Sequence, residues 1–190
     1  MIDNALLEED PPAPDKSRAR NLLEWVVIVV GALVVALVVK AFLLQAFYIP
    51  SLSMSPTLDI RDRVLVNKLS YDLHEVNRGD VVVFKSPRTN DGSEIKDLIK
   101  RVVGLAGETI ETRDGRVVVD GVELEESYLE PGIAPGPPVE RQVIPEGHVF
   151  VMGDNRANSK DSRSFGPIPE SLVVGRAFVK VWPVTDLGLL

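Results

Sequence analysis

The chain has 190 residues, enough for one domain or one and a half, and its formal charge at pH 7 is −7. This acidic balance argues against a nucleic-acid partner, which would need a basic surface. The lack of cysteine excludes a disulfide framework, a thiol nucleophile and Cys-ligated zinc, and the two histidines, with no HExxH-type pair, predict no metal site.

The N-terminal part reads as a tail followed by a membrane anchor. Residues 1–20 are polar, carry two adjacent prolines and charges of both signs, and predict a flexible tail. Residues 21–48 are apolar, without a charge from Trp25 to Val39 and without a polar stripe, and their length is that of a helix that crosses a bilayer. Lys40 lies near one end, where its stem can reach the interface. Interfacial aromatics are expected at both ends: Trp25, Phe42, Phe47 and Tyr48.

Basic residues set the expected orientation of this anchor. Lys16, Arg18 and Arg20 precede it, which predicts a cytoplasmic N-terminus, with the rest of the chain outside the cell membrane. The alternative is a cleaved secretory signal peptide. The apolar run is too long for that, and no convincing Ala-x-Ala site follows it, so we predict an uncleaved anchor.

The segment after the anchor, residues 49–190, is predicted to be an all-β domain. It consists of Val-rich runs of four to eight residues bounded by Gly, Asp, Asn or Pro, which is typical of strands. Asp-Gly pairs at 114–115 and 120–121 predict tight hairpins. We expect antiparallel sheets that close into a small barrel or sandwich. Residues 130–140 are too rich in Pro and Gly for a regular element and predict a surface loop.

A serine-rich stretch, "IPSLSMSPTL" at residues 49–58, follows the anchor directly. A serine hydroxyl is a weak nucleophile at neutral pH and needs a base. His74 and His148 lie in polar, turn-like contexts without an Asp placed to orient them, which indicates solvated surface histidines. The other base available to a serine is a lysine that burial keeps neutral.

Lys100 is the lysine with the most apolar neighbours, in "DLIKRVVGLAGE". The other lysines considered lie at strand ends or in polar loops: Lys68, Lys85, Lys96 and Lys160. Strand alternation places Lys100 on one face and Arg101 on the other. Spacing alone does not decide between them, because either cation also fits the solvent face of an edge strand. A third stretch, residues 152–169, gathers polar and charged side chains after an apolar strand, and by itself fits a solvated turn equally well.

Together these stretches resemble bacterial type I signal peptidase, the leader peptidase family of membrane-anchored serine-lysine endopeptidases. Four blocks match in order. They are "PSLSMSPTL", similar to the family's nucleophile motif; "RGDVVVF" at 78–84; "IKRVVGLAGE" at 99–108, similar to the block with the catalytic lysine; and "GDNRANSKDSRSFGPIP" at 153–169. The similarity covers the anchor and nearly all of the remaining chain.

The resemblance implies a role for six residues. Ser53 is the implied nucleophile and Lys100 the implied general base. Ser51 falls where the family has a hydroxyl that completes the oxyanion hole, and Ser159 where a hydroxyl orients the lysine amine. Asp161 and Arg163 fall where an ion pair holds the loop together.

The resemblance also implies two coiled antiparallel sheets, a reduced second subdomain at about 112–144 and no cofactor or metal. The implied partners are the lipid bilayer and secretory preproteins cut after small residues in an Ala-x-Ala pattern. Leu52 and Ala106 depart from residues frequent in the family, at positions that touch no reacting group. Two alternatives stay open at this point: a self-cleaving serine-lysine regulator, which the anchor and the negative charge oppose, and a non-enzymatic anchored β module that binds a partner.

Overall fold

The computed structural model describes residues 16–39, 43–87 and 96–190, which fall into two compact units, residues 1–39 and residues 40–190. The part of the predicted tail at residues 1–15, the predicted interfacial Lys40 and the aromatic Phe42 lie outside the described residues.

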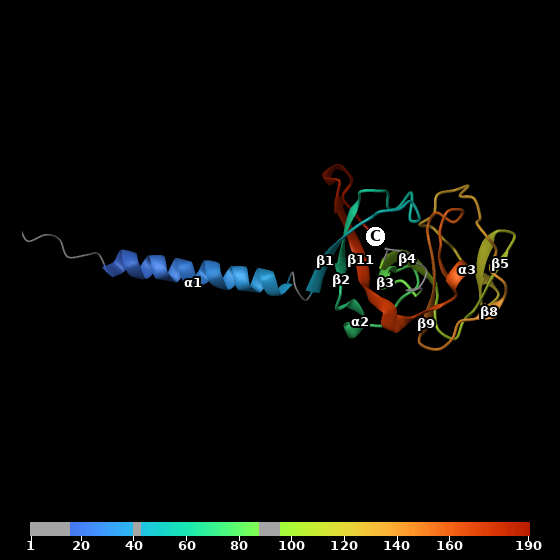
Figure 1. Ribbon diagram of the computed structural model, residues 1–190, viewed down its shortest axis with the longest axis horizontal. Helices are drawn as coiled ribbons and strands as arrows, with labels where there is room; N and C mark the ends of the chain where they lie inside the picture. The colour runs from blue at the N-terminus through green and yellow to red at the C-terminus, as the bar shows by residue number, and fades with distance from the viewer. Residues whose placement is uncertain (1–15, 40–42, 88–95) are drawn as a thin grey trace, which may run out of the picture. The chain divides into compact units, whose positions relative to one another are not determined.

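The first unit contains one long helix, α1 (Lys16–Val38) (Figure 1). Residues 20–37 have a mean hydropathy of 2.0, and none of them is buried by other parts of the protein. At about 1.5 Å per residue, the helix is about 35 Å long. It is therefore long and apolar enough to cross a membrane, as predicted.

The helix and the predicted anchor differ in their bounds. The helix begins at Lys16, inside the predicted tail, and ends at Val38. The last residues of the predicted span form a strand instead, β1 (Leu44–Tyr48), which pairs along its whole length with β2 (Arg63–Asn67). A short apolar run does not distinguish a helix from a strand, and here the partner strand decides.

The second unit is built on two antiparallel sheets, as expected for the all-β domain. The larger sheet has the order β1-β2-β11-β3-β4-β9-β10, with β12 paired to β11. Its further strands are β3 (Val81–Lys85), β4 (Asp97–Gly104), β9 (His148–Met152), β10 (Ile168–Pro169), β11 (Val173–Trp182) and β12 (Gly188–Leu189). The helices described after β2 have only three or four residues: α2 (Ser70–Leu73), α3 (Ser162–Phe165), η2 (Glu170–Leu172) and η3 (Val184–Asp186).

The smaller sheet forms most of the predicted second subdomain. Its order is β7-β6-β5-β8, from β5 (Thr109–Arg113), β6 (Arg116–Val119), β7 (Val122–Glu123) and β8 (Gln142–Val143). Both predicted Asp-Gly hairpins are confirmed, since Asp114, Gly115, Asp120 and Gly121 all have positive φ. This is the backbone that a tight turn between twisted strands requires. Residues 130–140 form no strand or helix, as predicted.

Three clusters of apolar side chains fill the domain. Along β3, Val81 and Val83 pack into one cluster while Val82 and Phe84 pack into another. The larger sheet is therefore covered on both faces, which explains why its strands are almost continuous runs of valine. A third cluster joins the two sheets, with Val103, Ile110, Val117, Phe150 and others.

Gly175 lies where β11 crosses β2 closely. A Cβ at this position would come within 2.3 Å of the Asn67 carbonyl oxygen, which is backbone and cannot move aside. We expect Gly175→Ala to lower the free energy of unfolding by about 2–3 kcal/mol, measured by denaturant unfolding of the solubilised protein. Gly188→Ala is the control, because no heavy atom lies within 4 Å of its added Cβ. Equal stability of the two variants would contradict the close packing.

Candidate active site

The turn that carries Ser53 is held in place by apolar side chains on both sides of it. Ile49, Met54 and Leu58 are fully buried in the cluster that covers one face of β3. The backbone N–H of Leu58 donates to the Met54 carbonyl at 2.9 Å, which closes the turn. The unusual hydrophobicity of this serine-rich segment therefore has a structural cause: it anchors a short irregular segment so that Ser53 has a fixed position.

Lys100 meets Ser53 in the interior of the domain. Its strand, β4, lies between β3 and β9, so the edge-strand alternative is wrong. The Lys100 side chain is 3% exposed, and Ser53 is 9% exposed. The Lys100 Nζ lies 2.7 Å from the Ser53 Oγ and 2.7 Å from the Ile99 carbonyl oxygen. The two residues, 47 positions apart in the sequence, are thus within hydrogen-bond distance.

Burial lowers the pKa of Lys100 to about 8, because the charged ammonium loses its hydration. Two carboxylates, Asp161 and Asp154, oppose this shift and favour the ammonium. Desolvation outweighs them, so a substantial part of the amine is neutral at mildly alkaline pH. A neutral amine next to a serine hydroxyl is able to accept its proton.

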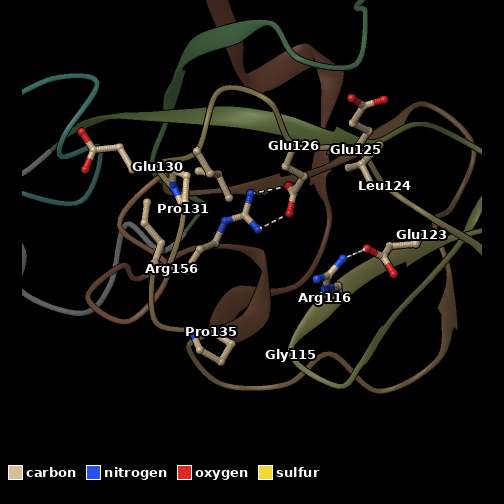
Figure 2. Close-up of a pocket in the computed structure, with 13 residues that line it drawn as sticks. Gly115, Arg116, Glu123, Leu124, Glu125, Glu126, Glu130, Pro131, Pro135 and Arg156 are labelled. Atoms are coloured by element: carbon tan, nitrogen blue, oxygen red, sulfur yellow. Dashed lines mark hydrogen bonds and ion pairs between the residues drawn. The ribbon is translucent and has the colours of Figure 1, made fainter.

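A small cleft of about 50 Å³ lies beside the pair. It is lined mainly by apolar residues of β1, the serine turn, β3 and β4, namely Phe47, Tyr48, Ile49, Pro50, Ser51, Ser53, Val83, Asp97, Leu98, Ile99 and Lys100. A larger cavity of about 480 Å³ includes neither Ser53 nor Lys100 in its lining. Figure 2 shows two ion pairs in its lining, Arg156 with Glu126 and Arg116 with Glu123. The cleft at Ser53 is therefore the better candidate for the site of chemistry.

The predicted ion pair between Asp161 and Arg163 is present, with both carboxylate oxygens engaged at 2.7 and 2.8 Å. The backbone N–H of Gly153 also donates to Asp161, at 2.9 Å. Burial alone would raise the pKa of Asp161, but the bonds from Arg163 and Gly153 outweigh it and hold the pKa below its usual range. Asp161 also caps the short helix α3. It thus fixes the loop that follows β9.

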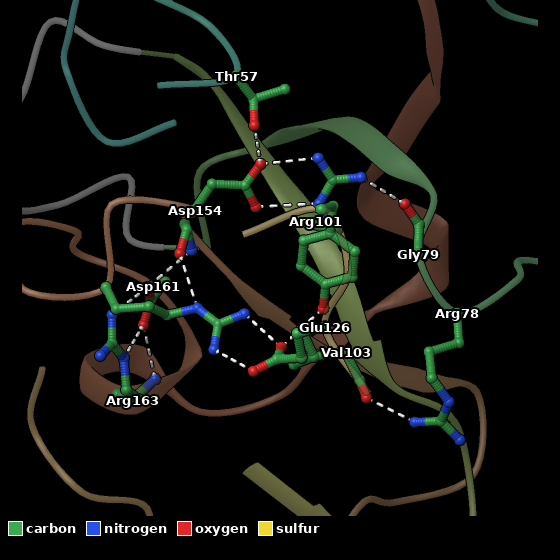
Figure 3. Close-up of polar contacts among 12 residues, drawn as sticks. Thr57, Arg78, Gly79, Arg101, Val103, Glu126, Asp154, Asp161 and Arg163 are labelled. Carbon is green, nitrogen blue, oxygen red and sulfur yellow. Dashed lines mark hydrogen bonds and ion pairs between the residues drawn. The ribbon is translucent and has the colours of Figure 1, made fainter. Parts of the chain in front are cut away.

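A second buried ion pair joins Arg101 to Asp154 (Figure 3). The guanidinium donates to both oxygens of Asp154, at 2.9 and 2.7 Å, and the Thr57 hydroxyl donates to the same carboxylate at 2.6 Å. The next residue, Asn155, donates its backbone N–H to the Ser53 carbonyl oxygen and its side-chain amide to the Leu52 carbonyl oxygen, both at 3.1 Å. These contacts tie the loop after β9 to the serine turn.

The sequence analysis assigns no role to four residues that support this site: Arg101, Asp154, Asn155 and Thr57. One feature of the sequence does indicate a buried ion pair. Arg101 lies inside an apolar strand and Asp154 follows another, and a charge buried in such a place needs a partner of opposite sign. Which partner it finds depends on the strand order, which spacing along the chain does not give.

The two remaining predicted hydroxyls have different surroundings. The Ser51 hydroxyl is exposed and donates to the Ser53 Oγ at 3.4 Å. The Ser159 hydroxyl lies against Gly153, where an added Cβ would come within 2.3 Å of both the Ser159 Oγ and the Ser53 carbonyl oxygen. Ser159 helps to lower the pKa of Asp161. Its Oγ is buried and, within the described residues, lacks a hydrogen bond of regular geometry.

Both histidines bond to the backbone of their own turns. The His74 Nδ1 lies 2.7 Å from the Glu75 carbonyl oxygen, and the His148 Nδ1 lies 2.9 Å from that of Glu146. His74 is exposed and His148 is partly exposed, in agreement with their predicted surface positions.

Comparison with known proteins identifies the family of the chain. The model of the family described as "Signal peptidase, peptidase S26" matches residues 22–182. The chain belongs to this family. Signal peptidase I of Leptolyngbya laminosa is 40% identical over 185 residues, which cover 94% of this chain and 89% of the relative. Signal peptidase IB of Staphylococcus aureus is 32% identical over 183 residues, which cover 88% and 93%.

A solved structure is also similar, that of a signal peptidase I from Enterococcus faecalis. It is 32% identical, with a TM-score of 0.46, and the match covers 54% of this chain and 97% of the other. Family membership makes the chain a serine endopeptidase, which excludes the alternative of a binding module without enzymatic activity. Together with the apolar helix α1, it also indicates attachment to a membrane.

Burial of Lys100 should reduce stability at neutral pH. Its pKa is about 8 in the folded protein and 10.5 without burial, so the unfolded chain binds the proton more tightly. This difference in pKa lowers the free energy of unfolding by about 3 kcal/mol below pH 8. The loss of stability disappears as the pH rises from 8 to about 10.5. We expect Lys100→Met to be more stable than the wild type at pH 7. The difference between their free energies of unfolding should become smaller at alkaline pH.

Denaturant unfolding of both detergent-solubilised proteins between pH 7 and 10.5 measures this difference in free energy of unfolding. Lys85→Met is the matched control, because Lys85 is exposed at the end of β3 and its replacement should leave no pH-dependent gap. A Lys100→Met protein less stable than the wild type at pH 7 would show that the ammonium is well solvated.

Proposed function

We propose that Ser53 and Lys100 form the catalytic dyad of a signal peptidase I that cuts secretory preproteins through an acyl-enzyme. The 2.7 Å distance between the Lys100 Nζ and the Ser53 Oγ, inside a buried site, is the observation that carries this assignment. The removal of signal peptides is the activity of the family to which the chain belongs.

In the first half of the reaction, the Ser53 Oγ attacks the carbonyl carbon of the scissile peptide bond while its proton passes to the neutral Lys100 Nζ. The tetrahedral intermediate collapses when the C–N bond breaks, and Lys100 gives the proton to the leaving amine. The signal peptide, which carries the carbonyl carbon of the broken bond, stays on Ser53 as an ester. Lys100 then takes a proton from water, the resulting hydroxide attacks the ester carbon, and the signal peptide is released while Lys100 returns the proton to the Ser53 Oγ.

Four further residues support the dyad in this proposal. The backbone N–H of Ser53 and the Ser51 hydroxyl stabilise the oxyanion, in keeping with the position of Ser51 next to the reacting oxygen. Ser159, whose buried Oγ has no regular hydrogen bond among the described residues, would orient the lysine amine during the reaction. Asp161 and Arg163 hold the loop that carries Ser159 and packs Gly153 against the Ser53 carbonyl.

We further propose that α1 spans the cell membrane with its N-terminus in the cytoplasm, so that the β domain works on the outer side. The basic residues at positions 16, 18 and 20 support this orientation. The substrates would be preproteins with small residues in an Ala-x-Ala pattern before the cut. Anchoring confines enzyme and substrate to one plane, which raises their effective concentration.

Removal of either reacting group should abolish processing. We expect Ser53→Ala and Lys100→Ala each to lower the rate of preprotein cleavage at least about 10³-fold, and the double variant to be no slower than Ser53→Ala, because the two groups act as a unit. Cleavage of a purified preprotein by the detergent-solubilised enzyme, followed on gels, measures this. Ser55→Ala and Lys85→Ala are matched controls that should stay active. Substantial cleavage by Ser53→Ala would refute the assignment.

The pH dependence should report the lysine. Since only the neutral amine accepts the serine proton, kcat/KM should rise with pH to a plateau with a midpoint near 8, the pKa of buried Lys100. A protein with both His74→Ala and His148→Ala should give the same curve. If a histidine were the base, the midpoint would lie at about 6.5, and the double variant would lose the rise of kcat/KM with pH.

A further inference from the structure

We propose that Tyr128 and Glu126, in the connection between β7 and β8, are positioning residues for the reacting pair. This inference rests on the proposed function of Ser53 and Lys100. Neither residue belongs to the serine turn or to the loop after β9. Both act through the two arginines that hold these segments, Arg101 and Arg156.

Tyr128 covers the guanidinium of Arg101. The Arg101 Cζ lies 4.2 Å from the centre of the Tyr128 ring, which is a close cation–π contact. Arg101 is buried, and its donors are taken by Asp154 and by the Gly79 carbonyl oxygen at 2.9 Å. The ring thus excludes water from a planar group whose edges are already bonded. This keeps the Arg101–Asp154 pair in one geometry and strengthens it, because its local dielectric stays low.

Two sets of hydrogen bonds connect Asp154 to the backbone around Ser53. Its carboxylate accepts from the Thr57 hydroxyl, which belongs to the serine turn. Its neighbour Asn155 donates from the backbone to the Ser53 carbonyl oxygen and from the side chain to Leu52. A shift of Asp154 therefore moves the backbone on which the Ser53 Oγ stands, and a displacement of about 1 Å is enough to reduce catalysis strongly.

Glu126 holds the second arginine. The Arg156 guanidinium donates to both Glu126 oxygens, with one bond at 2.7 Å, as the paired dashed lines in Figure 2 show. The Arg156 Nε donates to the Gly153 carbonyl oxygen at 3.2 Å. The Tyr128 hydroxyl donates to Glu126 at 2.7 Å and so links the two arginine contacts. One short turn, closed by a bond from the Leu129 N–H to the Glu126 carbonyl, serves both.

Stabilisation of the fold does not by itself account for this cluster of Tyr128, Glu126 and the two arginines. Buried ion pairs lose hydration energy that roughly offsets their attraction, so apolar residues would stabilise the same place at least as well. The 480 Å³ cavity is lined by both Glu126 and Arg156, so the pair does not simply fill a core. What the cluster supplies is a fixed geometry for two charged side chains next to the serine turn.

The proposal has a kinetic signature that loss of stability would not produce. Lys100 is faced by two carboxylates, Asp154 and Asp161, each neutralised by its own arginine. Without the Tyr128 ring, water weakens the Arg101–Asp154 pair, and the less neutralised Asp154 raises the pKa of Lys100. The midpoint of the pH–rate curve should therefore move upward, by about 0.5 pH unit or more, and kcat should fall while KM stays nearly constant.

The experiment compares variants of the full-length, detergent-solubilised enzyme on a signal-peptide substrate. We expect Tyr128→Leu to lower kcat about tenfold or more with KM within twofold, and to raise the pH midpoint. Tyr128→Phe keeps the ring over Arg101 and should retain activity within about threefold. Glu126→Gln keeps the size of the side chain but removes the charge opposite Arg156, and should lower kcat with folding intact.

Tyr71 provides the matched control. Its ring packs against an apolar cluster and its hydroxyl donates to Asp80 at 3.1 Å, so it resembles Tyr128 but has no contact with Arg101 among the described contacts. Tyr71→Leu should lower the melting temperature and leave kcat and the pH midpoint unchanged. If Tyr128→Leu behaves in the same way, and Glu126→Gln is fully active, the positioning role is overturned. An active Ser53→Ala enzyme would instead refute the dyad, and the inference with it.

Discussion

The burial of Lys100 against Ser53 is the constraint on which the rest of the domain depends. A lysine serves as a base near neutral pH only if its ammonium is disfavoured, and desolvation is the force that achieves this here. Lys100 is accordingly placed on an interior strand, and the serine turn is pinned over it by Ile49, Met54 and Leu58. The apolar contacts of this turn also fix the position of Ser53, the nucleophile of the proposed mechanism.

Charge near the buried amine has to be controlled as well. Asp154 and Asp161 hold the loop after β9 in place, yet each favours the charged form of Lys100. Asp154 is paired with Arg101 and Asp161 with Arg163, and the positive charge of each arginine opposes this effect while the hydrogen bonds that hold the loop are kept. The ion pairs of this site therefore fix the positions of both carboxylates and place a positive charge beside each of them. A carboxylate without its arginine would favour the Lys100 ammonium more strongly and raise the pKa of Lys100.

The two sheets are linked at this site as well as through their shared core. The apolar cluster around Val103 and Phe150 joins them by packing, which fixes their general placement. The Glu126–Tyr128 turn also contacts Arg101 and Arg156, which adds directional bonds where the connection between β7 and β8 passes the loop after β9. This explains how an irregular segment, followed by a loop rich in Pro and Gly, has a defined position without regular secondary structure: side-chain contacts fix it, together with the backbone bond from Leu129 to Glu126.

The sequence by itself determined the local features of this protein. Hydropathy predicts the helix α1, valine runs and Asp-Gly pairs predict strands and hairpins, and the four motif blocks point to Ser53 and Lys100. All of these depend on residues close together in the chain. Only the tertiary structure decided the rest. The apolar run at Leu44–Tyr48 became a strand because β2 offers hydrogen-bond partners along its length. The alternation of apolar residues along β4 fits a buried position for Lys100 and for Arg101 equally well. The strand order places Lys100 next to Ser53 and Arg101 next to Asp154. These partners are about 50 residues apart in the chain and meet only when the sheet has formed.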